Sequence, residues 1–260
     1  MLGVERREFI YKLLLERGSI TVSELSRLCQ IGEETIRRDL NKMAAAGRVE
    51  KIYGGACIRE TMHRVLPVAT RKVLNVDAKK QIAACCRDMV EEGDTIFLDG
   101  STTALQIAES LSSFQSLIVI SNSLEVAYSL ANAPGVKVIG IGGTMRNNTK
   151  TFVGHSSVAA IEEYYADKCF ICCDGADLDA GITDAHEQEA EVRKTMIRHS
   201  RVHVLTADST KFNRVSFARI TAWKDIDRVV TDLEPDSRWL QFFEELSIHC
   251  EFCDSGTGEG

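Results

Sequence analysis

Apolar residues in the first part of the chain recur at the spacing of short amphipathic helices. We expect a first helix from Arg6 to Gly18, because four apolar residues there have helical spacing: Phe9, Ile10, Leu13 and Leu14. After a short extended piece at 19–22, Thr21 and Glu24 have the spacing of a capping box. They predict a second helix, whose apolar residues are Leu25, Leu28 and Cys29.

A third helix is predicted to begin near Glu33 and to end before Gly47. Its core-facing residues, at i, i+4 and i+7, are Ile36, Leu40 and Met43. Its outer faces then carry Thr35, Arg37, Arg38 and Lys42. Residues 48–53 alternate like a strand and reach a Gly-Gly turn. This order predicts a winged helix-turn-helix whose third helix offers guanidinium groups to DNA; a small helical domain with a solvated arginine pair is the alternative.

From residue 78 the pattern changes to alternating helices and strands. Helices are predicted at 78–91, 104–111, 123–131, 158–165, 186–199 and 239–246. Strands are predicted at 95–99, 117–120, 136–141, 169–173, 202–205 and 228–231. Such alternation is typical of an α/β fold with a mostly parallel, Rossmann-like sheet covered on both faces. We therefore expect three parts: a head at 1–57, a linker at 58–77 and an effector domain at 78–260.

The distribution of charge differs between these parts. The 260-residue chain carries a net charge of -7, which taken whole argues against nucleic-acid binding. Residues 1–72, however, hold 14 Lys and Arg against 9 Asp and Glu, whereas the remaining residues hold 17 against 29. The chain is thus a basic head on an acidic body, so any contact with DNA is expected at the head alone.

Polar or glycine-rich segments follow five of the predicted strands. In α/β folds ligands bind at the carboxyl ends of strands, where helix N-termini and backbone N–H groups attract phosphate. Lys211 adds a charge for an anion, and Asp99 and Asp174 are candidate acceptors for hydroxyl groups. Helix capping alone also explains a single Gly-Ser-Thr loop. The set predicts a site for a phosphorylated sugar or polyol, made of Asp99, Gly100, Ser101, Thr102, Thr103, Asn122, Ser123, Gly142, Gly143, Asp174 and Lys211.

Cysteines and histidines are not expected to bind metal. Nine cysteines in a chain without an export-like N-terminus or a membrane span favour free thiols and a cytoplasmic location. Cys169 and Cys172 lie in a predicted buried strand, and Cys250 and Cys253 in a polar tail, so a zinc site joining the two pairs is disfavoured. The histidines show no metal-ligand spacing. We expect neither a metal nor another cofactor.

The residues of both parts resemble one family. The run Thr35-Ile36-Arg37-Arg38-Asp39-Leu40, with Tyr53-Gly54-Gly55-Ala56, closely resembles the DNA-binding domain of the DeoR family of bacterial transcription regulators. The departures are Gly32, where the family often has a hydroxyl residue, and Tyr53, where it often has His. The candidate DNA-binding residues are Thr21, Ser23, Glu34, Thr35, Arg37, Arg38, Lys42, Lys51 and Tyr53.

The body is similar to the effector domain of the same family, which is related to ribose-5-phosphate isomerase. The similar segments are 99–103, 121–123, 142–143, 154, 181–183 and 208–212, and 174–177 is similar to the DGAD motif of the isomerases. The resemblance implies a regulator, commonly a repressor of a carbohydrate or polyol operon. Its affinity for operator DNA is expected to change when a phosphorylated sugar or related metabolite binds. A homo-oligomer, dimer or tetramer, is expected because one recognition helix buries little surface.

An isomerase fused to a DNA-binding head is the alternative. Isomerisation needs a carboxylate base, for which Glu187, Glu189 and Glu191 are candidates. On a helix of mixed charge, together with Arg193 and Lys194, they are interpreted as a solvated face. The lysine loop that follows the DGAD motif of the isomerases is also missing at 178–183. We therefore expect no enzymatic activity.

Overall fold

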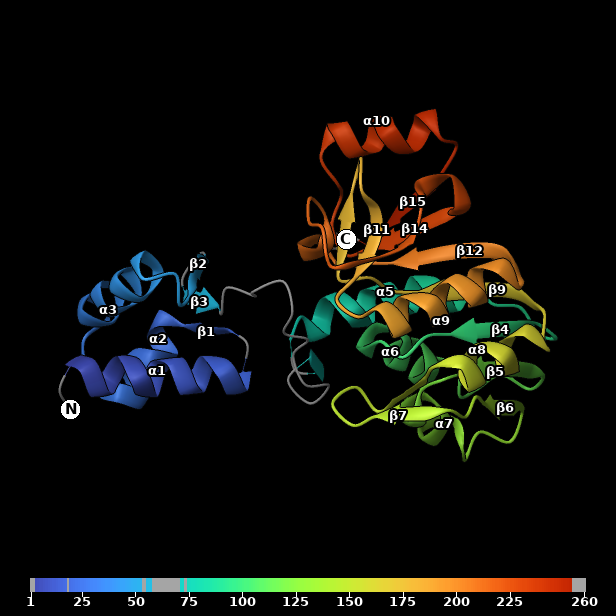
Figure 1. Ribbon diagram of the computed structural model, residues 1–260, viewed down its shortest axis with the longest axis horizontal. Coiled ribbons are helices and arrows are strands. Elements are labelled where there is room, and N and C mark those ends of the chain that lie inside the picture. Colours follow the sequence, from blue (N-terminus) through green and yellow to red (C-terminus); the bar gives the residue numbers. More distant parts are fainter. Residues whose placement is uncertain (1–2, 18, 53–54, 58–70, 73, 254–260) are drawn as a thin grey trace, which may run out of the picture. The chain divides into compact units, whose positions relative to one another are not determined.

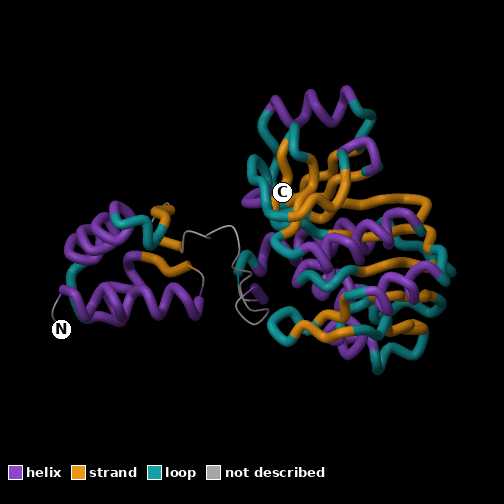
Figure 2. Tube along the Cα trace, viewed as in Figure 1, coloured by secondary structure: helices purple, strands orange, loops and turns teal. Residues whose placement is uncertain are grey.

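The computed structural model describes residues 3–17, 19–52, 55–57, 71–72 and 74–253. The chain divides into two compact units, Met1–Leu74 and Asn75–Gly260 (Figure 1). The first unit is mainly helical, and the second alternates strands and helices (Figure 2).

The first unit is a winged helix-turn-helix, as predicted. Its elements are α1 (Gly3–Arg17), β1 (Ser19–Thr21), α2 (Val22–Cys29), α3 (Glu33–Ala45), β2 (Glu50–Ile52) and β3 (Gly55–Cys57). The three strands form an antiparallel sheet in the order β1-β3-β2. The capping box of Thr21 and Glu24 opens α2 as expected. One core prediction is wrong: Leu28 is 45% exposed, because it lies about 90° around α2 from the centre of the buried face.

The second unit is built on a seven-stranded parallel sheet in the order β15-β14-β12-β9-β4-β5-β6. In that order the strands are His249–Phe252, Arg228–Thr231, Ser200–Thr206, Ala166–Ile171, Thr95–Leu98, Leu117–Ser121 and Val136–Gly140. The helices are α5 (Val76–Asp88), α6 (Thr102–Ser110), α7 (Leu124–Leu130), α8 (His155–Glu162), α9 (Glu187–Arg198) and α10 (Ser237–Glu245).

Alternate residues of the central strands enter two separate cores. Ile96 and Leu98 of β4 pack with residues of α5, α6 and α7, whereas Phe97 packs with residues of α8, α9 and α10. Because successive side chains of a strand point to opposite faces, this division makes three layers, with helices on both faces of the sheet. The predicted mostly parallel α/β fold is confirmed.

Several short strands were not expected from the sequence. A hairpin joins β7 (Thr144–Arg146) to β8 (Thr151–Val153), and a small antiparallel sheet holds β10 (Gly175–Asp177), β11 (Gly181–Asp184) and β13 (Ala218–Thr221). Two short 3-10 helices, η1 (Ser209–Lys211) and η2 (Trp223–Asp225), also belong to the second unit. Elements of three or four residues are too short to show a hydrophobic period.

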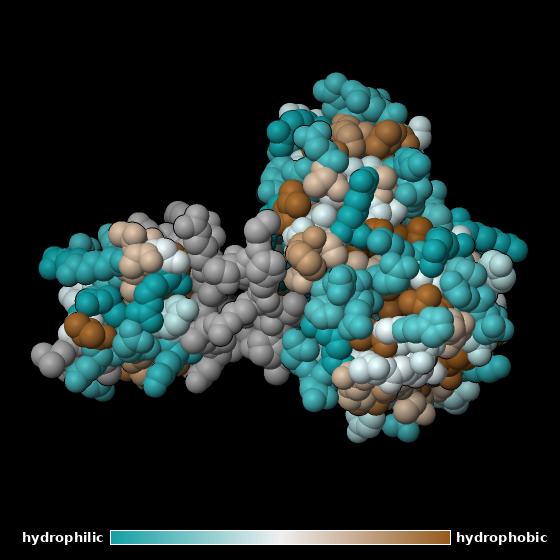
Figure 3. All heavy atoms as spheres, viewed as in Figure 1, coloured by the Kyte–Doolittle hydropathy of each residue, from teal (hydrophilic) through white to brown (hydrophobic). Residues whose placement is uncertain are grey.

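The outer surface is mostly hydrophilic on the face drawn in Figure 3, with scattered hydrophobic residues. In the described part of the chain, no helix has the length and apolar character that a membrane crossing requires.

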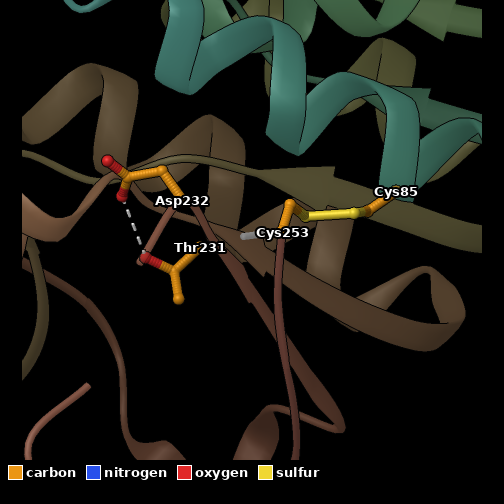
Figure 4. Close-up of a disulfide and its surroundings, with 4 residues drawn as sticks. All are labelled: Cys85, Thr231, Asp232 and Cys253. Carbon is orange, nitrogen blue, oxygen red and sulfur yellow. Dashed lines mark hydrogen bonds between the residues drawn. A yellow bond between two sulfur atoms is a disulfide. The ribbon is translucent and has the colours of Figure 1, made fainter. Parts of the chain in front are cut away.

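Two cysteines are joined, contrary to the expectation of free thiols. Cys85 of α5 forms a disulfide with Cys253, which directly follows β15 (Figure 4). The expectation of a polar tail at 250–253 is also wrong, because most of this segment belongs to β15, a strand at the edge of the sheet. The pairing joins residues 168 positions apart, so spacing along the sequence could not indicate it.

The disulfide should stabilise the second unit. A crosslink across so long a loop restricts the unfolded chain and typically contributes about 2–5 kcal/mol. We expect urea unfolding of the wild-type protein to shift to lower urea when a reductant is added. The Cys253→Ser variant should unfold at the same urea concentration with and without reductant. A wild-type urea midpoint that is the same with and without reductant would contradict the pairing of Cys85 with Cys253.

Candidate functional site

A buried ion pair holds α3 in place in the first unit. Asp39 is 4% exposed and accepts from Arg6 Nε at 2.5 Å and from Arg7 Nη1 at 3.2 Å. Both arginines belong to α1, so Asp39 joins α3 to α1 from the side that also buries Ile36 and Leu40. The pairing fixes which face of α3 remains outside. Neither Arg6 nor Asp39 was among the predicted functional residues.

The outer face of α3 carries the predicted DNA-binding side chains. Glu34, Arg37, Arg38 and Lys42 are exposed, and Thr35 is half-buried. Arg37 pairs with Glu33 at 3.2 Å, one turn earlier, whereas Arg38 and Lys42 form no ion pair with any described residue. The result is a helix face with three cationic side chains reaching solvent.

Of the other predicted DNA-binding residues, two are exposed on α2 or just before it, and two have side chains that the structure does not describe. Thr21 and Ser23 are exposed at the start of α2, and Thr21 Oγ1 accepts from the N–H of Glu24 at 3.2 Å as the helix cap. Lys51 lies in β2, but its side chain, like all of Tyr53, is outside the described residues.

In the second unit, the five predicted strand ends belong to neighbouring strands. They follow β12, β9, β4, β5 and β6, which are consecutive in the sheet and all parallel. Gly100 passes close to the hairpin β7–β8: a Cβ atom there would lie 2.0 Å from Thr151 Cγ2. Ser101 caps α6 by accepting from the N–H of Ala104 at 2.9 Å. The N–H groups of Thr102 and Thr103 in the first turn therefore remain without an acceptor within the helix.

Asp99 holds this strand end together. It is 1% exposed; Oδ1 accepts from Ser101 N, and Oδ2 accepts from Cys172 N and from Arg193 Nε at 2.5 Å. Burial acts to raise the pKa of Asp99, but Arg193 and the hydrogen bonds outweigh burial and lower it. Although predicted to accept a ligand hydroxyl, Asp99 is already occupied by the protein.

Arg193 is surrounded by three carboxylates. Besides Asp99, its guanidinium donates through Nη1 to Asp184 Oδ2 and lies 3.7 Å from Glu189 Oε2. Glu189 Oε1 also accepts from Arg146 Nη1 at 2.5 Å and from Thr151 Oγ1 at 2.9 Å. These contacts join α9 to β4, to β11 and to the hairpin β7–β8.

The predicted solvated face of α9 is therefore wrong for two of its residues. Glu189 and Arg193 are 5% and 4% exposed, whereas Glu187 and Glu191 are exposed. Positions i and i+4 share a face of a helix, so Glu189 and Arg193 turn inward together, whereas Glu187 and Glu191 turn outward together. The i, i+4 spacing of Glu189 and Arg193, with Asp184 just before the helix, is the signal that could have identified them.

The buried carboxylates do not titrate alike. The pKa of Asp184 is raised to about 6, chiefly by burial; Arg193 acts to lower it, and the charges of Asp174 and Glu189 act to raise it. The same guanidinium that lowers the pKa of Asp99 therefore only limits the rise at Asp184.

Lys211 and Asp174 are the partly accessible charges at this edge. Their side chains are 22% and 28% exposed, and Lys211 Nζ lies 3.9 Å from Asp174 Oδ1. Burial acts to lower the pKa of Lys211, but Asp174 and Asp208 outweigh it and raise the pKa, so the amine stays protonated. Because the two charges are 3.9 Å apart and partly exposed, Lys211 can pair with another anion instead of Asp174.

Asn122 contributes an unpartnered acceptor. It is 2% exposed, and its Nδ2 donates to Phe152 O at 2.8 Å, but its buried Oδ1 has no hydrogen-bond partner among the described residues. A Cβ atom added at Gly100 would lie 3.8 Å from this oxygen, so Asn122 Oδ1 is close to the start of α6. Unsatisfied buried acceptors are uncommon and call for a partner.

Three other predicted ligand-binding residues have structural roles. Ser123 Oγ caps α7 through the N–H of Val126, and Gly142 O accepts from Ser157 Oγ at 2.7 Å. Gly143 has φ +143°, and a Cβ atom there would lie 2.1 Å from Ser157 Oγ and 2.9 Å from Val153 O, so a larger residue would clash with both.

In the second unit, two cationic residues besides Arg193 were missed. Arg146, on β7, has a side chain 14% exposed, and Lys79, in α5, is 6% exposed. The part of the chain that the structure describes holds no group of three or more His, Cys, Asp or Glu arranged for a metal ion.

Two family models and several known proteins match the chain. Residues 6–62 match a DeoR-like helix-turn-helix domain, and residues 74–233 match a DeoR C-terminal sensor domain. YulB of Bacillus subtilis, an uncharacterised HTH-type transcriptional regulator, is 36% identical over 95% of this chain and 96% of its own length. The glycerol-3-phosphate regulon repressor of Escherichia coli K12 is 26% identical over 97% and 100%. Among solved structures, ribose 5-phosphate isomerase A of Methanocaldococcus jannaschii is 16% identical, with a TM-score of 0.39, over 53% of this chain and 55% of that one.

Removing Arg193 should strongly destabilise the second unit. Arg193→Met leaves buried carboxylates without their cation, which typically costs about 3–5 kcal/mol. Lys194→Met is the matched control, because its side chain is 41% exposed and its loss should cost about 1 kcal/mol or less. Urea unfolding measures both variants. Equal midpoints for the two would contradict the central position given to Arg193.

Proposed function

Because the chain belongs to the DeoR family of transcriptional regulators, we propose that α3 binds operator DNA and that a phosphorylated sugar or polyol, bound at the strand ends of the second unit, changes this binding. The observation that carries the proposal is the coincidence, at one edge of the sheet, of an amide-rich helix start, a protonated lysine and an unpartnered amide oxygen.

The DNA-binding part of the proposal rests on α3. Its exposed arginines can pair with phosphates or with the O6 and N7 atoms of guanine in the major groove. Contact with repeated half-sites requires more than one copy, and we propose a dimer or a tetramer acting in the cytoplasm.

The proposed ligand carries a phosphate group at one end and hydroxyl groups at the other, and each end has its own partners in the site. The phosphate would accept from the N–H groups of Thr102 and Thr103 and pair with Lys211. A hydroxyl group would donate to Asn122 Oδ1, which needs a donor that the described residues do not supply. Asp174 can accept from a second hydroxyl group. This division favours a small polyhydroxy phosphate.

Repression of a carbohydrate or polyol operon is the outcome we propose. The name of the glycerol-3-phosphate regulon repressor supports it, because that relative matches along its full length. Ligand binding changes operator affinity only if the ligand prefers one of two arrangements of the protein.

We propose no isomerase activity. Glu189, the buried carboxylate of the earlier candidates, is bonded to Arg146 and Thr151 and lies close to Arg193. A carboxylate held by two guanidinium groups is a poor proton acceptor.

Loss of Arg38 should weaken operator binding. Arg38→Ala removes one contact to a base or a phosphate, which is worth about 1–3 kcal/mol, or roughly 5- to 150-fold in Kd. Fluorescence anisotropy with an operator selected from a random library by the wild-type protein measures the effect. Arg87→Ala, an exposed arginine of the second unit, is the control and should bind as the wild type does. Unchanged binding by Arg38→Ala would remove this residue from the interface.

Loss of Lys211 should weaken the ligand response and spare DNA binding. A charge-assisted contact to phosphate is worth about 1.5–3 kcal/mol, so ligand affinity should fall roughly 10- to 150-fold. Thermal-shift titration with ribose 5-phosphate, glycerol 3-phosphate and fructose 1-phosphate measures it, with exposed Lys224→Ala as the matched control. A normal response by Lys211→Ala would place the phosphate elsewhere.

Incubation with ribose 5-phosphate should give no ketose product. The wild-type protein and Glu189→Gln should both match the uncatalysed rate, followed by the absorbance of ribulose 5-phosphate. Turnover by the wild type that is lost in Glu189→Gln would favour the isomerase alternative.

A further inference from the structure

The disulfide lies at the end of a short series of contacts that leads to η1. The N–H of Cys253 donates to Thr231 O at 3.0 Å, and Thr231 is the last residue of β14. Thr231 Oγ1 in turn donates to Asp232 Oδ1 at 3.3 Å. Figure 4 shows these four residues, with Cys85 reaching Cys253 from α5.

Asp232 then fixes the start of η1. It is 8% exposed; Oδ1 accepts from Ser209 N at 2.6 Å, and Oδ2 accepts from Ser209 Oγ at 3.3 Å. Ser209 begins η1, and Lys211 ends it. The position of Lys211 therefore depends on Asp232, which follows the strand against which Cys253 is held.

A second contact joins α5 to the same segment. Asn75, the residue before α5, has a left-handed backbone with φ 49° and does not use its side chain to cap the helix. Its Nδ2 instead donates to Asp208 Oδ1 at 3.3 Å. Asp208 is 3% exposed and caps η1. Helix α5 is thus tied to η1 directly near its start and, through the disulfide, near its end.

Cys85 and Cys253 are less buried than five of the other described cysteines. Both are half-buried, whereas Cys29, Cys86, Cys169, Cys172 and Cys173 are buried. Burial raises the pKa of all five of these thiols, of Cys169 to about 12. Half-buried Cys250 is likewise disfavoured as a thiolate, because burial raises its pKa to about 11. Thiolates are the reactive species, so these six cysteines are poor competitors in exchange reactions.

We propose that Cys85 and Cys253 form a redox modification site that sets the ligand affinity of the second unit. With the disulfide closed, the end of β15 is fixed to α5, and Asp232 holds η1 and Lys211 in the binding position. With the disulfide reduced, this support loosens and ligand affinity falls. The role given to Lys211 rests on the function proposed above.

The chemistry is exchange with a dithiol–disulfide couple. A thiolate of the dithiol attacks one sulfur of the Cys85–Cys253 bond, which forms a mixed disulfide and releases the other cysteine as a thiolate. The second thiol of the dithiol then attacks the mixed disulfide. The dithiol is oxidised to a cyclic disulfide by loss of two electrons and two protons, and the two cysteines are reduced to thiols. The reverse sequence closes the bond.

Hydrogen exchange of the ligand-free protein tests the structural step. The full-length protein is equilibrated with oxidised or with reduced dithiothreitol, and exchange is followed by mass spectrometry. We expect reduction to speed exchange in segments 209–212 and 250–253 by about fivefold or more, and to leave the first turn of α6 unchanged. Equal exchange in both states at 209–212 would overturn the proposal.

Titration with ribose 5-phosphate tests the functional step. We expect its Kd to rise by about fivefold or more on reduction of the wild-type protein. The Cys85→Ser and Cys253→Ser variants should each show the weaker Kd under both conditions. Cys250→Ser, on the same strand, should keep the redox response of the wild type. A wild-type Kd independent of redox state would overturn the proposal.

The two proposals fail in different ways. If reduction changes exchange at 209–212 but no sugar phosphate binds in either state, the ligand assignment is wrong and the redox site stands as a structural switch. If sugar phosphates bind and reduction changes neither exchange nor Kd, the redox proposal alone is wrong.

Discussion

One buried guanidinium organises the second unit. Arg193 pairs with carboxylates from three separate segments: Asp99 after β4, Asp184 at the end of β11 and Glu189 of α9 itself. A buried charge is tolerated only when it is paired and hydrogen-bonded, so each segment is held where its carboxylate meets this one cation. Through Glu189 the arrangement continues to Arg146, on the hairpin β7–β8.

This constraint explains why the edge of the sheet has separate structural and accessible groups. Asp99 and Glu189 are occupied by Arg193, by backbone N–H groups or by Thr151, and Ser101 and Ser123 cap helices. The groups that we propose for a ligand are fewer: the N–H groups at the start of α6, Asn122 Oδ1 and Lys211. The first set provides a rigid frame, and the second set can exchange its partners.

A smaller buried ion pair orients α3 in the first unit. Asp39 belongs to the run 35–40 that carries the family resemblance of α3, yet it faces inward and binds Arg6 and Arg7 of α1. The buried carboxylate thereby determines which face of α3 its arginine neighbours present. Since the second unit carries most of the acidic residues, the exposed cations of this face are the contact with DNA that we propose, and salt should weaken that contact.

The sequence predicted the parts that depend on local periodicity. The helices of the head, the alternating strands of the body and the parallel sheet all follow from spacing over ten or so residues. It did not predict contacts between distant segments, because spacing carries no information about them. Arg193 and Glu189 were interpreted as surface residues, the disulfide of Cys85 and Cys253 was missed, and Asp99 was assigned to a ligand rather than to Arg193. The segments predicted to form the candidate site do follow neighbouring strands of the sheet, but the contacts of their residues could be seen only in the structure.

The most direct test of the account is a crystal structure of the protein with the sugar phosphate that raises its melting temperature most. We expect a phosphate group bound to the N–H groups of Thr102 and Thr103 and to Lys211 Nζ, a hydroxyl group on Asn122 Oδ1, and Arg193 still paired with Asp99 and Asp184. A sugar phosphate bound elsewhere, with these groups unchanged, would contradict the proposed site.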